Sequence, residues 1–162
     1  LPASSAASDV YKRQELGYNY RMTDLQAALG ISQMNRVDEF VSSRHKQAQR
    51  YDDRLKDLPI ILPFQADTCY SSFHLYVIRL NLDVIEKSHK QVFEELRSKN
   101  IGVNLHYIPV HLHPYYQTMG FKSGDFPEAE QYSKEAISSP IFHGLKKDQQ
   151  DVVIQAITEV LA

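Results

Sequence analysis

One amphipathic run near the start of the chain constrains the fold most. From Asp24 to about Lys56 apolar residues recur at steps of three and four positions, and no proline intervenes before Pro59. A single helix of this extent would be about 50 Å long, longer than the roughly 35–40 Å across a compact domain of this size. We therefore predict that its first half packs on a large domain or a second subunit. A kink would weaken this argument, and Gly30 followed by Ser32 is where we expect one.

The start of this helix is marked by its own residues. Thr23 is followed three positions later by Gln26, which is the capping-box signature of a helix start. Asn19 and Arg21 lie just ahead of it, where an amide and a guanidinium can be held toward an anion such as phosphate. The alternative is a loop that only positions the helix.

Composition narrows the class of protein. The 162 residues are 43% hydrophobic and 23% charged with a net charge of −2, which is typical of an ordinary soluble globular protein. The near-neutral balance gives no electrostatic case for binding nucleic acid or an anionic membrane, and no apolar run is long enough to span a bilayer. Cys69 is the one cysteine, so an internal disulfide is impossible, which agrees with a cytoplasmic location.

The rest of the chain alternates strand and helix patterns. Residues 59–63 predict a brief strand or extended connector, residues 73–80 and 103–108 predict strands, and residues 88–99, 127–136 and 147–161 predict helices. The fold class expected is α+β, with a long N-terminal helix followed by a small antiparallel sheet flanked by helices.

The first fourteen residues differ from the remainder. They are small and polar, and they resemble a translated sequencing adapter of the kind found at broken ends of open reading frames. We exclude them from the fold and expect the natural protein to continue upstream of Glu15. The predicted organisation is a non-native tail at 1–14, an inter-subunit arm and long helix at 15–57, and a small α+β domain at 58–162.

Histidines form the sharpest cluster of potential ligands. His106, His111 and His113 invite a metal interpretation, but Pro109 breaks the strand and the nearest acidic residue downstream is Asp125, so no metal is predicted. Two alternatives remain. The histidines are either satisfied at a sheet edge, or they line a pocket where neutral imidazoles donate to hydroxyls or phosphates.

Four segments resemble a known family. The run GYNYRMTDLQAALG at residues 17–30 resembles the segment after the catalytic lysine in pyridoxal-phosphate sugar-nucleotide aminotransferases, the DegT/StrS family. The segments at 71–78, 102–111 and 136–142 resemble the same family in the same order. The resemblance covers nearly all of residues 15–162, and the sequences of the second and third segments are most similar to the branch of the family on the pseudaminic acid route. Ser139 stands where a leucine is expected in relatives.

The resemblance implies a function for the whole protein. It implies that this chain is the C-terminal small domain of a fold-type I aminotransferase. It implies that the whole protein is a homodimer, that it binds pyridoxal 5'-phosphate, and that it moves an amino group from L-glutamate to a UDP-linked 4-keto sugar. The implied cofactor-binding residue is Asn19, and the implied substrate-binding residues are Tyr18, Arg21, His74, His106 and His111. The family's catalytic lysine would lie upstream, so this fragment alone is predicted to be inactive. The alternatives are a lysine-less regulatory or sensor relative, and a helical dimerisation module.

Overall fold

The computed structural model describes residues 20–105 and 107–161. The chain divides into two compact units, Leu1–Arg36 and Val37–Ala162. The second unit begins at Val37, so the helix over Val37–Leu55 belongs to the same compact unit as the small antiparallel sheet. The predicted arm at 15–57 remains a hypothesis about the whole protein. No helix among the described residues combines the length and apolar character that crossing a membrane requires.

The first unit contributes one helix, α2 (Asp24–Met34). Its predicted start is confirmed, because the Thr23 hydroxyl accepts from the Gln26 amide N–H at 3.3 Å while the Gln26 side-chain oxygen accepts from the Thr23 N–H at 2.9 Å. The two side chains thereby each accept a hydrogen bond from the other residue's backbone N–H. Contacts between neighbouring residues therefore fix where the helix begins.

The prediction of one continuous helix to Lys56 was wrong. A turn at Asn35 and Arg36 separates α2 from α3 (Val37–Leu55). The Arg36 N–H donates to the Gln33 carbonyl three residues back at 3.0 Å, which tightens the backbone out of the α-helical ladder. Asparagine is a poor helix former and suits such a turn. Gly30, where a kink was expected, lies inside α2.

The second unit is built on a four-stranded antiparallel sheet with strand order β1-β2-β4-β3. The strands are β1 (Ile60–Ile61), β2 (Tyr76–Leu80), β3 (Asn104–Leu105) and β4 (Ala136–Ser139). The predicted fold class is confirmed. The sequence analysis missed β4 because its sequence, AISS, holds one large apolar residue and follows a helix with no intervening turn.

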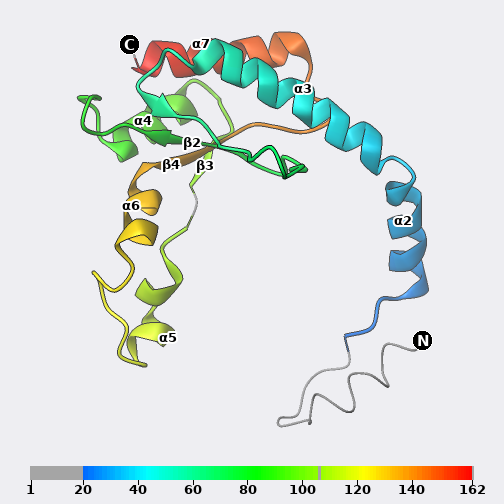
Figure 1. The fold of residues 1–162 in the computed structure, drawn as a ribbon, viewed down its shortest axis with the longest axis horizontal. Helices are drawn as coiled ribbons and strands as arrows, with labels where there is room; N and C mark the ends of the chain where they lie inside the picture. Colours follow the sequence, from blue (N-terminus) through cyan, green and yellow to red (C-terminus); the bar gives the residue numbers. More distant parts are fainter. Residues whose placement is uncertain (1–19, 106, 162) are drawn as a thin grey trace. The chain divides into compact units, whose positions relative to one another are not determined.

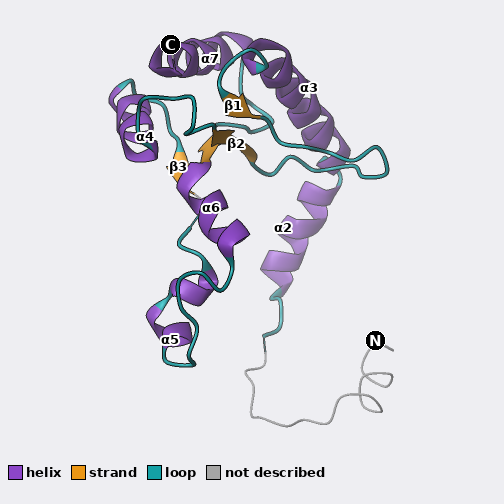
Figure 2. Ribbon diagram, turned by 60° about the vertical axis from the view of Figure 1, so that its left-hand side comes forward, coloured by secondary structure: helices purple, strands orange, loops and turns teal. Residues whose placement is uncertain are grey.

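Helices cover both faces of the sheet (Figure 1; Figure 2). Those with bounds not yet given are α4 (His89–Ser98), η1 (Val110–Leu112), α5 (Pro114–Gln117), α6 (Pro127–Glu135) and α7 (Lys147–Leu161). Tyr76 and Ile78 of β2 point into the core shared with α3, α4 and α7. Arg79 points to the other face and pairs with Glu135 of α6, as the alternation of a strand requires.

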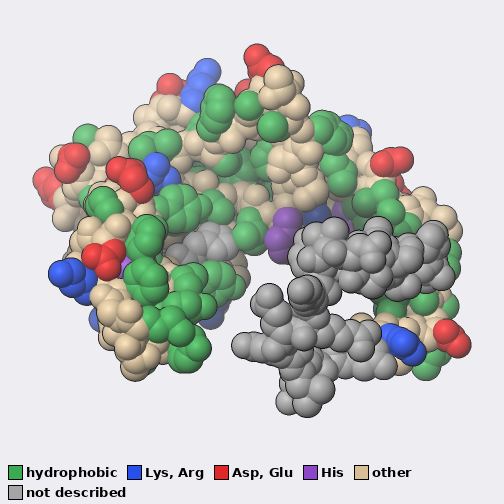
Figure 3. Space-filling view, turned by 60° about the horizontal axis from the view of Figure 1, so that its bottom comes forward, with side chains coloured by type: hydrophobic (Ala, Val, Ile, Leu, Met, Phe, Trp, Pro, Cys, Tyr) green, Lys and Arg blue, Asp and Glu red, His purple; other side chains and the backbone are tan. Residues whose placement is uncertain are grey.

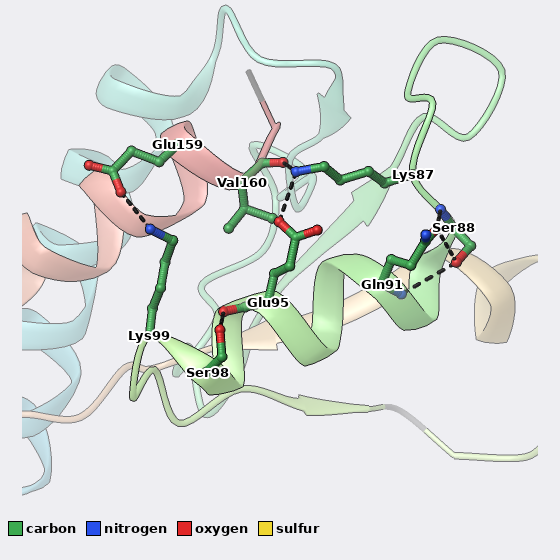
Figure 4. A network of polar contacts seen from close by, with 8 residues as sticks. All are labelled: Lys87, Ser88, Gln91, Glu95, Ser98, Lys99, Glu159 and Val160. Atoms are coloured by element: carbon green, nitrogen blue, oxygen red, sulfur yellow. Dashed lines mark hydrogen bonds and ion pairs between the residues drawn. The ribbon is translucent and has the colours of Figure 1, made fainter.

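Polar contacts fix α4 against the end of α7 (Figure 4). The Lys87 ammonium donates to Glu95 Oε2 and to the Val160 carbonyl, each at 2.8 Å, and Lys99 pairs with Glu159 at 2.7 Å. The Lys99 hydrogen bond holds the pKa of Glu159 below its usual range. Exposed ion pairs contribute little stability, so these contacts orient helices that apolar burial holds together.

Two hydroxyls near the start of β2 differ in their hydrogen bonding. The Tyr51 hydroxyl donates to the Pro140 carbonyl at 2.8 Å. The Ser139 side chain is 4% exposed, and its hydroxyl has no hydrogen-bond partner among the described residues. A buried polar group without a partner loses its hydration and gains nothing in return.

We predict that Ser139→Ala raises the free energy of unfolding by about 1 kcal/mol, because it removes a hydroxyl that is desolvated and unpaired. Tyr51→Phe is the matched control: it also removes one hydroxyl from this region, but a paired one, and should lower stability by about 1 kcal/mol or more. Urea denaturation followed by circular dichroism measures both. Equal destabilisation by the two variants would contradict the prediction.

Candidate functional site

Three of the six predicted site residues are placed by the structure. Tyr18, Asn19 and His106 lie outside the described residues. Arg21, His74 and His111 are described, and each belongs to a different part of the chain.

Arg21 lies just ahead of the capping box, and its side chain is exposed. The helix that follows buries none of its residues. Its large apolar side chains are therefore exposed, with Leu25 at 85% and Leu29 at 64%. An exposed apolar face of this kind marks a contact surface, so the arginine stands beside a surface suited to a partner.

His74 is exposed and lies two residues before β2. Its neighbour Phe73 has a φ of +43°, a left-handed conformation that is strained for an aromatic residue. The Phe73 ring makes an edge contact with the His45 ring, with centroids 4.8 Å apart, and the Tyr70 ring stacks on His45 with centroids 4.2 Å apart. The His45 ring lies 2.7 Å, through Nε2, from the Ser71 carbonyl. Aromatic packing thus holds a strained loop that presents His74 to solvent.

His111 is buried rather than presented to solvent. Its side chain is 6% exposed, and its Nε2 lies 2.9 Å from Glu130 Oε1. The ring also contacts Phe126 at 4.9 Å between centroids. The predicted substrate-binding histidine therefore already has a carboxylate partner within this chain.

Glu130 is the centre of a small polar cluster, which we call the Glu130 hub: Glu130, His111, Ser123 and Gly124. The Ser123 hydroxyl donates to Glu130 Oε2 at 2.8 Å and the Gly124 N–H donates to Oε1 at 2.7 Å. The hydrogen bond from His111, then those from Gly124 and Ser123, lower the pKa of Glu130 to about 2. The hub holds an ionised carboxylate in a nearly buried place.

The structure does not bring His74 and His111 together. β2 and β3 both pair antiparallel with β4, so they run parallel to each other. His74 precedes the start of β2, whereas η1 follows the end of β3, so the two histidines flank opposite ends of the sheet, with α5 beyond the β3 end (Figure 1). A site that used both would need further elements to bridge them.

A cavity of about 610 Å³ lies beside His113, between the end of β3 and α6. Its lining is His89, Leu105, Tyr107, Ile108, Pro109, Leu112, His113 and Ser133. The His89 Nε2 lies 3.0 Å from the Ala136 carbonyl. Residues 20–105 and 107–161 contain no group of three side chains able to hold a metal ion.

Sequence reasoning missed Glu130, Ser123 and Gly124. An acidic residue in the first turn of a helix is ordinarily explained by the helix dipole, so Glu130 gave no sign of being buried. The signal available in the sequence was a glycine between Ser123 and Asp125, which is typical of a turn, and in the structure Gly124 has a φ of +94°, a conformation for which glycine is preferred. Only the fold shows that its N–H is aimed at a carboxylate.

The fold defines the class of protein as a small α+β domain that follows, in the chain, a capped helix with exposed apolar side chains. The chain belongs to the DegT/DnrJ/EryC1/StrS aminotransferase family, which matches residues 3–158. The match begins within the segment 1–14, so the exclusion of that segment stays a prediction.

Similar proteins include biosynthetic and regulatory ones. The spore coat polysaccharide biosynthesis protein SpsC of Bacillus subtilis is 37% identical over 161 residues, covering 98% of this chain and 41% of the relative. A pleiotropic regulatory protein of Geobacillus stearothermophilus is 34% identical, covering 92% and 40%. The chain thus spans about two fifths of the length of these curated relatives.

Solved structures agree with the fold. Helicobacter pylori PseC, an aminotransferase involved in the biosynthesis of pseudoaminic acid, matches with a TM-score of 0.81 at 26% identity, covering 91% of this chain and 40% of PseC. The PLP-form of the sugar aminotransferase Spr1654 of Streptococcus pneumoniae matches with a TM-score of 0.80 at 27% identity, covering 94% and 40%.

We predict that the Glu130 hub loosens in acid. The pKa of Glu130 is depressed in the folded chain, so its contribution to stability is complete above pH 4.5, its ordinary pKa, and is lost as the pH falls from there toward 2. The protection factor of the Gly124 amide, which compares its exchange rate with the intrinsic rate at the same pH, should fall in NMR measurements taken from pH 5 down to 2. Glu130→Gln has no carboxylate to titrate and should show no such step; a step of equal size in that variant would contradict the assignment.

Proposed function

We propose that the chain is the C-terminal part of a cytoplasmic, homodimeric, pyridoxal-phosphate-dependent aminotransferase that acts on a nucleotide sugar. Family membership supports the reaction class. The observation that carries the proposal for this part of the protein is α2, a helix with a well-formed N-terminal cap and no buried residue. Such a helix is ordered by local contacts, and within the described part of the chain it has none of the apolar burial that stabilises most helices in proteins.

The arm around α2 would complete a binding pocket in a second subunit. In this proposal Asn19 donates to the cofactor phosphate, and Tyr18 and Arg21 contact the substrate's diphosphate or support the arm. Arg21 is exposed beside the capped start of α2, where a guanidinium can form paired hydrogen bonds with phosphate oxygens.

The amide of Asn19 is a donor that suits the phosphate end of pyridoxal 5'-phosphate, and the phenol of Tyr18 and the guanidinium of Arg21 are donors that suit the diphosphate of a nucleotide sugar. When bound, the cofactor supplies an electron sink for amino transfer. The lysine that holds the cofactor is proposed to lie upstream of residue 15, because the run at residues 17–30 resembles the segment that follows the catalytic lysine in the family.

The substrate is proposed to be a UDP-linked 4-keto-6-deoxy sugar that receives the amino group at C4 from L-glutamate. The resemblance to PseC supports a place in pseudaminic acid biosynthesis, where the product would be UDP-4-amino-4,6-dideoxy-N-acetyl-beta-L-altrosamine. His74 and His106 would contact the sugar nucleotide. Because Glu130 engages Nε2 of His111, that histidine would reach a substrate only through its other ring nitrogen.

A regulatory role without catalysis is the second candidate. It is favoured by one observation, the similarity to a relative named as a pleiotropic regulatory protein. The sequence upstream of residue 15 discriminates the two, since an enzyme needs the cofactor lysine there. The third possibility, a dimerisation rod, loses its main support because the helix is interrupted at Asn35 and Arg36.

We predict that the chain alone forms no covalent adduct with pyridoxal phosphate at a specific lysine. The purified chain is mixed with the cofactor, reduced with borohydride and digested, and labelled lysines are located by mass spectrometry. Weak labelling spread over exposed lysines is expected, with no transfer from glutamate. One stoichiometrically labelled lysine, together with amino transfer that its replacement by arginine abolishes, would overturn the fragment assignment.

We also predict that the exposed face of α2 drives self-association of the chain. Leu25→Lys together with Leu29→Lys should reduce the apparent mass in light scattering, because the change removes two apolar side chains that are mostly exposed. Leu25→Gln together with Leu29→Gln removes the same apolar side chains without adding charge and is the matched control. If the glutamine pair leaves the apparent mass unchanged, charge rather than loss of apolar contact is responsible, and the prediction is wrong.

A further inference from the structure

The segment between β3 and α6 is organised in an unusual way. We call residues 107–126 the η1–α5 lobe, after the two short helices it contains. Within it His111 is the one buried residue, Pro109 and Leu112 are half-buried, and all other residues are exposed. The lobe therefore has no hydrophobic core of its own.

The exposed residues of the lobe include many large apolar ones. Figure 3 shows hydrophobic side chains gathered over this lobe. They are Tyr107, Ile108, Val110, Tyr115, Tyr116, Met119, Phe121 and Phe126, which are between 37% and 81% exposed. In this chain their apolar surface faces water and gives the lobe little of the burial that usually offsets the entropy of ordering a loop.

Backbone hydrogen bonds of the lobe are local. Those within it join residues three to five positions apart, such as His113 to Val110 and Phe121 to Tyr116. Bonds of this range shape individual turns, but they do not fix where the lobe lies against the sheet and α6.

The Glu130 hub supplies the missing long-range connection. Three hydrogen bonds lead from the lobe to the Glu130 carboxylate, one from the entry of the lobe at His111 and two from its exit at Ser123 and Gly124. One side chain of α6 thus holds both ends of the lobe. Hydrogen bonds to an ionised acceptor are roughly twice as strong as neutral ones, and burial strengthens them further.

Gly124 is built for this role. Its φ of +94° turns the N–H toward the carboxylate, and an added Cβ would meet no atom within 4 Å. Space does not require glycine here; the backbone conformation does. The sequence therefore contributes a specific backbone geometry to the hub in addition to side chains.

We propose that Glu130 is a latch: its carboxylate, in place of a hydrophobic core, holds the η1–α5 lobe in position against α6. The lobe begins directly after residue 106 and contains His111. If the proposed function is right, the latch also sets where His111 meets the sugar nucleotide; the latch itself stands independently of that function.

Hydrogen exchange with mass spectrometry on the whole chain tests the latch. Glu130→Gln should reduce protection in peptides covering 107–126 by about tenfold while peptides covering β2 and α7 are unchanged. Glu135→Gln is the matched control, because Glu135 is also a buried carboxylate of α6 but pairs with Arg79 on β2. It should leave the lobe as protected as in the unmodified chain.

Two gentler variants keep the test decisive if Glu130→Gln unfolds the chain. Ser123→Ala removes one of the three hydrogen bonds and should give a smaller loss of protection, confined to the lobe. Gly124→Ala leaves every hub side chain in place, yet should loosen the lobe through its backbone. Unchanged lobe protection in Glu130→Gln, equal loss in Glu135→Gln, or loss in β2 and α7 in the two gentler variants would overturn the proposal. No activity is measured, so failure here is distinct from failure of the proposed function.

Discussion

The pairing of β4 is the interaction on which the rest of the second unit depends. This strand of four residues is hydrogen-bonded to β2 on one side and β3 on the other, and all four of its residues are buried. Ile137 lies in the core with α3, α4 and α7, and α6 leads directly into the strand. Because β3 has only two residues, without β4 neither β3 nor the lobe that follows it would have a fixed place.

That dependence explains which parts of the fold the sequence predicted. Elements with a strong local pattern were found: the capped start of α2, the helices α4 and α7, and the strand β2. β4 was missed because its burial comes from its neighbours on both faces, whereas its own residues are mostly small or polar. A helix or strand whose own residues carry a strong pattern can be predicted from the sequence. A strand such as β4, which is stabilised by the elements that pack around it, can be identified only from the tertiary structure.

The candidate site divides in the same way. Histidines were singled out by residue type, but type does not reveal that His111 is paired with Glu130, nineteen positions away, or that His74 lies at the other end of the sheet. Sequence spacing also could not show the break at Asn35, since the apolar stripe of α2 and α3 passes through that turn without a change of period. A periodic pattern predicts which face of a helix is apolar, but it does not show whether the helix is continuous. Here the backbone hydrogen bonds at Asn35 and Arg36 decide that.

Two segments with exposed apolar side chains, α2 and the η1–α5 lobe, are therefore ordered by contacts of different kinds. In α2 no residue is buried, so among the described residues its order rests on a capping box and local hydrogen bonds. In the η1–α5 lobe apolar side chains are equally exposed, but a buried carboxylate supplies tertiary fixation. A polar latch has a directional geometry that an apolar contact lacks, so it can define the position of a loop before any partner covers it. A loop held this way arrives at a partner surface already shaped, which lowers the ordering entropy that binding must offset.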